Sequence, residues 1–275
     1  MRHHFTIDVE EHFQVSAFEN SVARADWDQH ESRVVGNVAA LLELLAEAEA
    51  GGTFFVLGCV AERHPEMVRE IAAAGHEVAS HGWGHERATE LSRDLFRDDV
   101  RRSKRLLEDL VGEPVLGYRA PSFSIVPGRE WALDVLLEEE YRYDSSLFPV
   151  RRRGYGYPNG NPDPHWLERP LGKLAEFPPT TLRLFGMSLP AGGGAYFRLF
   201  PPVLVWAALR ACERRGVPGT FYIHPWELDP DQPRVNAGWP TRLRHYGGLG
   251  QVRPRVQRLL CDFAFAPIRD TLGAL

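Results

Sequence analysis

Five short segments of the sequence carry side chains that can bind a metal ion or move a proton. They are Asp8-Val9-Glu10-Glu11, Ser80-His81-Gly82-Trp83-Gly84-His85, Arg119-Ala120-Pro121-Ser122, Asp144-Ser145-Ser146 and His224-Pro225-Trp226-Glu227. Each follows or ends a stretch of strand character, and in a parallel α/β barrel the carboxyl ends of the strands meet at one face. Convergence of the five segments at that face would create an active site.

Two imidazoles four residues apart, His81 and His85, are candidate ligands of one metal ion. On a helix this spacing places both rings on one side, whereas the intervening glycines favour a compact loop, and either geometry can hold one ion. Two neutral imidazoles and one carboxylate leave coordination positions open, which is typical of a catalytic zinc site. The same spacing also arises by chance in a chain with eleven histidines.

The acidic cluster at residues 8–11 has two interpretations. Adjacent carboxylates commonly cap a helix or lie in a solvated turn. Beside a metal ion, one carboxylate can bind the cation while another accepts a proton from water. The planar guanidinium of Arg119 can hold such a base in one orientation. A purely structural ion pair is the simpler role for Arg119. His224 and Asp144 also admit structural roles, as a barrel-end histidine and a turn residue.

Short apolar runs alternate with amphipathic stretches through most of the chain, which predicts repeated βα units. Strands are expected at residues 4–8, 53–57, 77–80, 115–118, 142–144, 174–177, 219–223 and 263–265. Helices are expected at residues 34–48, 65–74, 131–140 and 202–214, and in the stretch that Ser92 caps and Gly112 ends. Seven or eight parallel strands with outer helices indicate an α/β fold, an irregular (β/α)7–8 barrel of TIM type.

Residues 150–170 depart from this rhythm because Arg, Gly, Pro and Asn dominate them. The stretch is either a domain linker or a long loop. We expect a loop, since strand and helix signals resume after it and His224 is needed at the same site. The sequence therefore predicts one domain over residues 1–275, with the C-terminal segment completing the barrel.

The composition excludes several classes of protein. With 44% apolar and 25% charged residues, the chain is not compositionally disordered. A net charge of −5 and short, isolated basic runs argue against a nucleic-acid partner. The three cysteines form no CxxC pair and predict no disulfide framework. No signal peptide or membrane span is recognisable, so a cytoplasmic location is expected.

Taken in order, these segments resemble the NodB-homology polysaccharide deacetylases, carbohydrate esterase family 4, over nearly the whole chain. More narrowly, residues 8–13, 118–124, 143–149 and 221–227 resemble the branch associated with exosortase-linked exopolysaccharide gene clusters. The resemblance implies a NodB-homology fold and a single divalent metal ion, expected to be Zn²⁺. It also implies removal of N-acetyl groups from an amino-sugar polymer or oligosaccharide.

The resemblance implies metal ligands at His81, His85 and one carboxylate. The family usually has two adjacent aspartates, first a general base and then a metal ligand. Here Asp8 matches the base, and the ligand must come from Glu10 or Glu11. We expect Glu10, because the two-residue alternation of a strand keeps it on the same side as Asp8.

The resemblance also implies the remaining catalytic roles. Arg119 matches the arginine that steadies the base, and His224 matches the general acid. Asp144 resembles the carboxylate of the fourth motif, which would orient the imidazole of His224, although the tryptophan often found near it is missing. An oxyanion would be held by the backbone N–H of Ser122, since Pro121 has none to offer.

Two other functions fit parts of the pattern. A small-molecule amide or cyclic-amide hydrolase could use the same scaffold. A non-catalytic carbohydrate-binding protein would be expected to have lost the base or the acid, yet Asp8 and His224 are both present. Candidate aromatic platforms for a sugar, each of which could equally serve ordinary packing, are Trp83, Tyr155, Tyr157, Trp166 and Tyr196.

Overall fold

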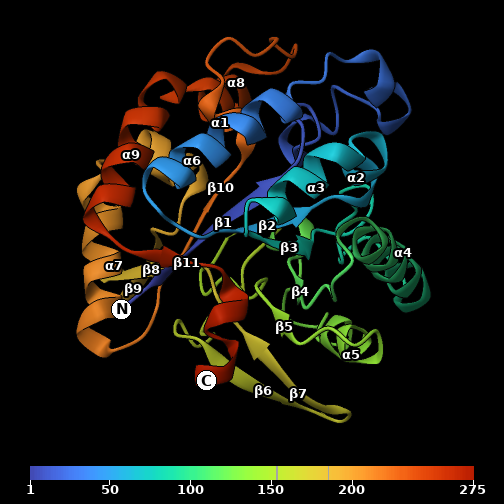
Figure 1. The fold of residues 1–275 in the computed structure, drawn as a ribbon, viewed down its shortest axis with the longest axis vertical. Helices are drawn as coiled ribbons and strands as arrows, with labels where there is room; N and C mark the ends of the chain where they lie inside the picture. The colour runs from blue at the N-terminus through green and yellow to red at the C-terminus, as the bar shows by residue number, and fades with distance from the viewer. Residues whose placement is uncertain (153, 185) are drawn as a thin grey trace.

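The computed structural model describes residues 1–152, 154–184 and 186–275 and contains one curled main sheet with helices around it (Figure 1). In spatial order its strands are β10 (Thr220–Ile223), β1 (His3–Val9), β2 (Thr53–Val56), β3 (Glu77–Ser80), β4 (Gly117–Tyr118), β5 (Tyr143–Asp144), β7 (Gly172–Glu176) and β6 (His165–Arg169). A further strand, β11 (Phe265–Ala266), pairs with the start of β1. All of these pairings are parallel except that of β6 with β7.

The two ends of the parallel sheet meet through a single bridge rather than a full strand pair. Pro179, just after β7, forms an isolated parallel bridge with Thr220 of β10. The adjacent Thr180 donates its backbone N–H to the carbonyl oxygen of Thr220 at 3.0 Å. The predicted irregular α/β barrel is therefore confirmed, and its irregularity lies at this closure.

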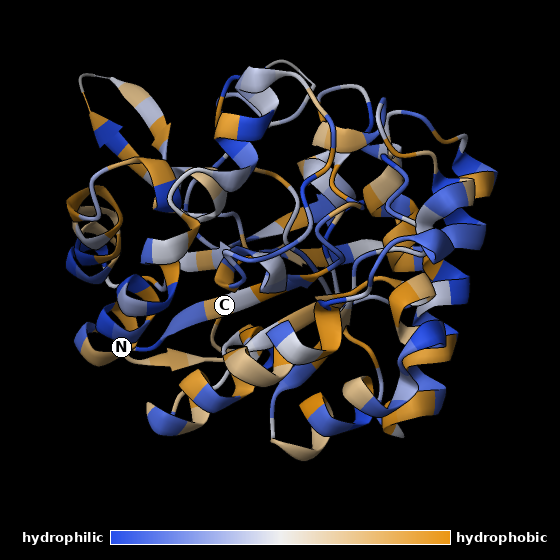
Figure 2. Cartoon of the chain, turned by 90° about the horizontal axis from the view of Figure 1, so that it is seen from above, coloured by the Kyte–Doolittle hydropathy of each residue, from blue (hydrophilic) through white to orange (hydrophobic). Residues whose placement is uncertain are grey.

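The helices are α1 (Val34–Glu47), α2 (Gly58–Arg63), α3 (Pro65–Ala73), α4 (Arg93–Val111), α5 (Trp131–Glu138), α6 (Gly194–Leu199), α7 (Val203–Arg215), α8 (Trp239–Tyr246) and α9 (Val252–Asp262). In helix α4 the hydroxyl of Ser92 accepts a hydrogen bond from the N–H of Leu95, and Gly112 ends the helix with a φ of 72°. These are the boundaries that the capping signals predict. Figure 2 shows apolar and polar residues alternating along the outer helices.

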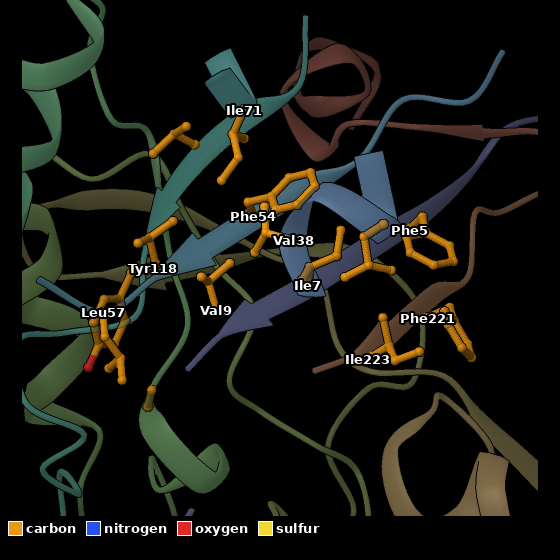
Figure 3. Packing of buried hydrophobic residues seen from close by; sticks show 14 of the residues in the cluster. Phe5, Ile7, Val9, Val38, Phe54, Leu57, Ile71, Tyr118, Phe221 and Ile223 are labelled. Carbon is orange, nitrogen blue, oxygen red and sulfur yellow. The ribbon is translucent and has the colours of Figure 1, made fainter. Parts of the chain in front are cut away.

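Alternation along β1 separates the hydrophobic core from the reactive face. Phe5, Ile7 and Val9 are fully buried and pack with residues of α1 and neighbouring strands (Figure 3). Thr6 and Asp8 point to the opposite face, where Arg119 contacts both. Because successive strand side chains alternate, the apolar residues that anchor β1 also fix the direction of Asp8.

One expectation about the loop at 150–170 is wrong at its end. Residues 165–169 form β6, which pairs antiparallel with β7, and Arg169 binds Asp134 of α5. The strand was missed because its residues are only partly buried or exposed, so His-Trp-Leu-Glu-Arg lacks the apolar run that marks a buried strand. The hairpin of β8 (Thr181–Leu184) and β9 (Met187–Pro190) was also not expected.

Within the described residues, no helix is at once long enough and apolar enough to traverse a bilayer.

Candidate active site

Three buried side chains form a cluster that can hold a metal ion: Glu10, His81 and His85. One ligand atom from each lies within 4.8 Å of the others. Glu10 follows β1, while His81 and His85 belong to the loop after β3. Parallel pairing of β1, β2 and β3 brings these strand ends together.

The donor atoms of this cluster fit a divalent cation. Oε2 of Glu10 is 2.9 Å from Nε2 of His85, yet it is buried without a well-oriented hydrogen bond to any described residue. Nδ1–H of His81 donates to the backbone carbonyl of Arg119 at 2.8 Å, which leaves Nε2 as the ligand atom. Ligand atoms that converge without bonding one another are typical of an ion site.

The pKa values of these groups favour the metal-binding forms. Burial lowers the pKa of His81 to about 4, so its imidazole is neutral at pH 7. Burial alone would raise the pKa of Glu10, but the nearby imidazoles of His85, His224 and His81 outweigh it and hold that pKa at about 2. A neutral imidazole and an ionised carboxylate are the forms that bind a metal.

Glu11 has a different environment. Its carboxylate accepts hydrogen bonds from the hydroxyl of Ser32 and from the backbone N–H of Arg33 at 3.0 Å. Arg33 immediately precedes α1, so Glu11 stabilises the entry to this helix. The geometry thus favours Glu10 over Glu11 as the carboxylate ligand.

The candidate base, Asp8, is held from behind by a fully buried guanidinium. Nη1 of Arg119 donates to Oδ1 of Asp8 at 2.6 Å and to the hydroxyl of Thr6 at 2.8 Å. The Nη2 and Nε groups of Arg119 donate to the hydroxyl and carbonyl oxygens of Ser145. Four directional bonds fix the guanidinium, which leaves Oδ2 of Asp8 for other chemistry.

The candidate acid, His224, follows β10, the strand paired with β1, and lies near Asp8. Its Nδ1 is 2.8 Å from Oε1 of Glu227, and its Nε2 is 3.5 Å from Oε1 of Glu10 and 3.9 Å from Oδ2 of Asp8. Burial opposes a charged imidazole, but Glu10, Glu227 and Asp8 outweigh it and raise the pKa of His224 to about 9. Stacking on Trp226, at 5.1 Å between ring centroids, restricts the ring further.

The structure does not support the role expected for Asp144. One oxygen of its carboxylate accepts from the hydroxyl of Ser146 at 2.6 Å, and the other accepts from the backbone N–H of Ser146 at 3.1 Å. Glu227, rather than Asp144, lies beside Nδ1 of His224. Sequence reasoning overlooked Glu227, although it stands three residues after His224 in a segment already recognised.

These groups open into one cavity of about 320 Å³. Asp8, Glu10, His81, His85, Ser122 and His224 all line it. Ser122 has a φ of 55°, an uncommon conformation for a residue other than glycine. Such strain is found at functional sites when the surrounding structure enforces it. The cavity therefore brings together all the predicted site residues except two. Arg119 contacts Asp8 from outside the cavity, and Asp144 does not line it.

Two of the five candidate aromatic platforms reach this cavity. Tyr155 and Tyr196 line it, and their hydroxyl oxygens are 3.0 Å apart. Trp83 instead packs beneath the guanidinium of Arg102, and the hydroxyl of Tyr157 donates to Glu130. Trp166 lies on β6, which is not among the strands around the cavity.

Comparison with protein families matches two parts of the chain. Residues 26–128 match the family "Polysaccharide deacetylase", and residues 145–273 match a domain of unknown function, DUF3473. The first match contains His81, His85 and Arg119, and the second contains His224 and Glu227. The proposed site therefore draws on both matched regions and on the strand that precedes them.

Among curated proteins, the chain is 32% identical over 112 residues to a peptidoglycan deacetylase of Helicobacter pylori, covering 40% of this chain and 36% of that protein. It is 33% identical over 81 residues to a peptidoglycan-N-acetylglucosamine deacetylase of Bacillus cereus, covering 30% of this chain and 38% of that protein. The chain thus spans little more than a third of either relative.

Among solved structures, a Mycobacterium smegmatis protein described as a polysaccharide deacetylase superposes with a TM-score of 0.67. The match covers 98% of this chain and 88% of that one, at 24% sequence identity. At this identity the match establishes the shared fold.

Proposed function

Because the chain carries a domain of the polysaccharide deacetylase family, we propose that it is a metal-dependent hydrolase that removes N-acetyl groups from amino sugars of a bacterial exopolysaccharide. One observation carries the proposal. Asp8 and His224, a carboxylate and an imidazole each braced by a second charged residue, face the Glu10, His81 and His85 cluster inside one cavity.

Asp8 is the proposed general base. Oδ1 of Asp8 accepts a hydrogen bond from Arg119. Its other oxygen, Oδ2, is therefore the atom that accepts the proton of the water that attacks the acetyl carbonyl. A divalent cation held by Glu10, His81 and His85, which we propose to be Zn²⁺, supplies Lewis-acid polarisation and lowers the pKa of water. The guanidinium of Arg119 holds the carboxylate of Asp8 in one orientation while the proton moves.

His224 is the proposed general acid. Glu227 accepts a hydrogen bond from Nδ1, which directs the Nε2 proton toward the departing nitrogen. The backbone N–H of Ser122 is the proposed donor to the oxyanion. Cleavage of the C–N bond releases acetate and leaves a free amine on the sugar. Tyr155 and Tyr196 are the proposed contacts for neighbouring sugar rings.

We further propose that residues 1–275 act as one NodB-homology unit. β1 pairs with β2 on one side and with β10 and β11 on the other, so the N-terminal strand lies between early and late parts of the chain. Asp8 on β1 and His224 after β10 depend on this pairing for their proximity.

Acetate release from N-acetylated chitooligosaccharides tests the proposed reaction. Protein purified without chelator is expected to contain bound zinc and to release acetate, and chelation should abolish that release until zinc is restored. Small linear and cyclic amides serve as comparison substrates. Hydrolysis confined to the small amides would support the alternative amidase function, and absence of any hydrolysis by the zinc-loaded protein would contradict both.

Two neighbouring glutamates provide a matched test of the metal site. Glu10→Gln is expected to weaken zinc affinity about tenfold or more, because a neutral amide replaces a charged ligand. Glu11→Gln should retain zinc, since Glu11 contacts Ser32 and Arg33 instead of the cluster. Zinc titration of both variants gives the measurement, and equal affinities would refute the assignment of Glu10.

A further inference from the structure

Helix α8 exposes an apolar face to solvent. Trp239 and Leu243 are 76% and 58% exposed, and their spacing of four residues places them on one side of the helix. Leu199 and Phe200, at the end of α6, are each 43% exposed, and α6 packs against α8. We call these four residues the α8 apolar surface.

The segment that carries α8 is basic. Residues 232–246 contain three arginines and no Asp or Glu, although the whole chain has a net charge of −5. Arg234, Arg242 and Arg244 are the arginines nearest in sequence to Trp239 and Leu243, and all three are exposed. None of the three forms a salt bridge with any residue that the structure describes. The guanidinium of Arg234 lies over the ring of Tyr246, 4.2 Å from its centroid, but no carboxylate neutralises it. The charges of the three arginines therefore remain available to an external anion.

The α8 apolar surface adjoins the mouth of the catalytic cavity. Arg244 and His245, both in α8, line that cavity. In Figure 1, α8 lies at the end of the molecule opposite the β6–β7 hairpin. A partner bound at α8 would thus be next to the site and far from the hairpin.

We propose that this surface docks on an anionic lipid membrane. Unpaired arginines attract anionic headgroups, and an exposed tryptophan and leucine on one helical face can enter the interface between headgroups and acyl chains. A soluble polyanion would satisfy the arginines but would leave Leu199, Leu243 and Phe200 exposed to water. The combination of charge and aliphatic surface therefore favours lipid. This proposal concerns binding and does not depend on the hydrolytic activity.

Sedimentation of the full chain with phosphatidylcholine vesicles, with or without phosphatidylglycerol, tests the proposal. Binding is expected only to the anionic vesicles and should weaken as salt is added. Arg242→Gln should reduce vesicle affinity about fivefold, from the roughly 1 kcal/mol that each arginine contributes near an anionic surface. The double variant Trp239→Ser, Leu243→Ser should reduce it about tenfold or more, through loss of buried apolar area.

Matched controls lie away from α8, on the β6–β7 turn and on α4 (Figure 1). Leu171 is 61% exposed in the β6–β7 turn, and Arg105 is exposed on α4. The variants Leu171→Ser and Arg105→Gln therefore remove the same kinds of side chain away from α8. Both should bind anionic vesicles like the wild type. Circular dichroism checks folding, and acetate release from soluble chitooligosaccharides should be unchanged in the Trp239, Leu243 double variant.

Three outcomes would overturn the proposal. They are equal binding to neutral and anionic vesicles, no vesicle binding at all, and equal losses in the control and α8 variants. Retention on immobilised alginate without vesicle binding would instead identify the surface as a site for acidic polysaccharide. Failure of acetate release would leave vesicle binding unaffected, so the two proposals fail independently.

Discussion

Asp8→Asn is expected to lower the rate of acetate release about 10³-fold, within the range that a general base contributes. Asparagine has nearly the same shape as aspartate but cannot take a proton from water at neutral pH. Its Oδ1 can still accept the hydrogen bond from Arg119, so the surrounding geometry is retained. Steady-state kinetics on chitooligosaccharides, with zinc content measured on the same preparation, provides the check.

His81→Ala is the comparison for this variant. It should lose both activity and bound zinc, because His81 belongs to the three-residue cluster. Asp8→Asn should lose activity alone, since Asp8 lies outside that cluster. Wild-type turnover in Asp8→Asn, or loss of zinc from it, would disprove the division between base and ligand.

Folding must be measured alongside this activity loss. Arg119 is fully buried, and removing the charge of Asp8 leaves its guanidinium without a counter-ion, a change that can cost about 3–5 kcal/mol of stability. Hydrogen bonds from Arg119 to Thr6 and Ser145 remain and reduce that cost. Thermal unfolding identifies a temperature at which wild type and variant are both folded, and rates are compared there.

Local signals in the sequence predicted the elements that carry the site. The period of two along a strand directs Asp8 and Thr6 away from Phe5 and Ile7, so the direction of the proposed base follows from β1 alone. The same period favoured Glu10 over Glu11, and the observed cluster agrees with it. Such predictions succeed because they depend on bonds and burial within a few residues.

Contacts across the barrel were harder to predict from the sequence. Whether Asp144 on β5 reaches His224 after β10 depends on how the barrel closes. The contact between Glu227 and His224 is local, but the strand-end pattern does not reveal the turn that makes it. A short 3₁₀ turn at Pro225–Leu228 brings the carboxylate of Glu227 back to His224. The carboxylate of Asp144 instead accepts hydrogen bonds from the N–H and hydroxyl of Ser146. Strand β6 was missed for a related reason, since its stability comes from pairing with β7 rather than from its own apolar content.

Replacement of Glu227 is the second change expected to have a large effect on the rate of acetate release. Glu227→Gln is expected to lower the rate of acetate release about 10²-fold. A neutral amide holds the Nδ1–H tautomer of His224 less firmly than a carboxylate does, and it also stabilises the charged imidazole of His224 less. Glu227 is one of the groups that raise the pKa of His224, so its removal should lower that pKa. The protonated acid would then be lost at a lower pH, and the alkaline limb of the rate profile should move toward acid.

Asp144→Asn separates this positioning role from general damage to the barrel. Its side chain contacts Ser146 rather than His224, so the variant should keep the wild-type position of the alkaline limb even if its free energy of unfolding falls. A merely structural role for Glu227 would lower stability without moving that limb. An unchanged limb in Glu227→Gln, or an equal shift in Asp144→Asn, would therefore argue that His224 is not oriented by Glu227 during proton transfer.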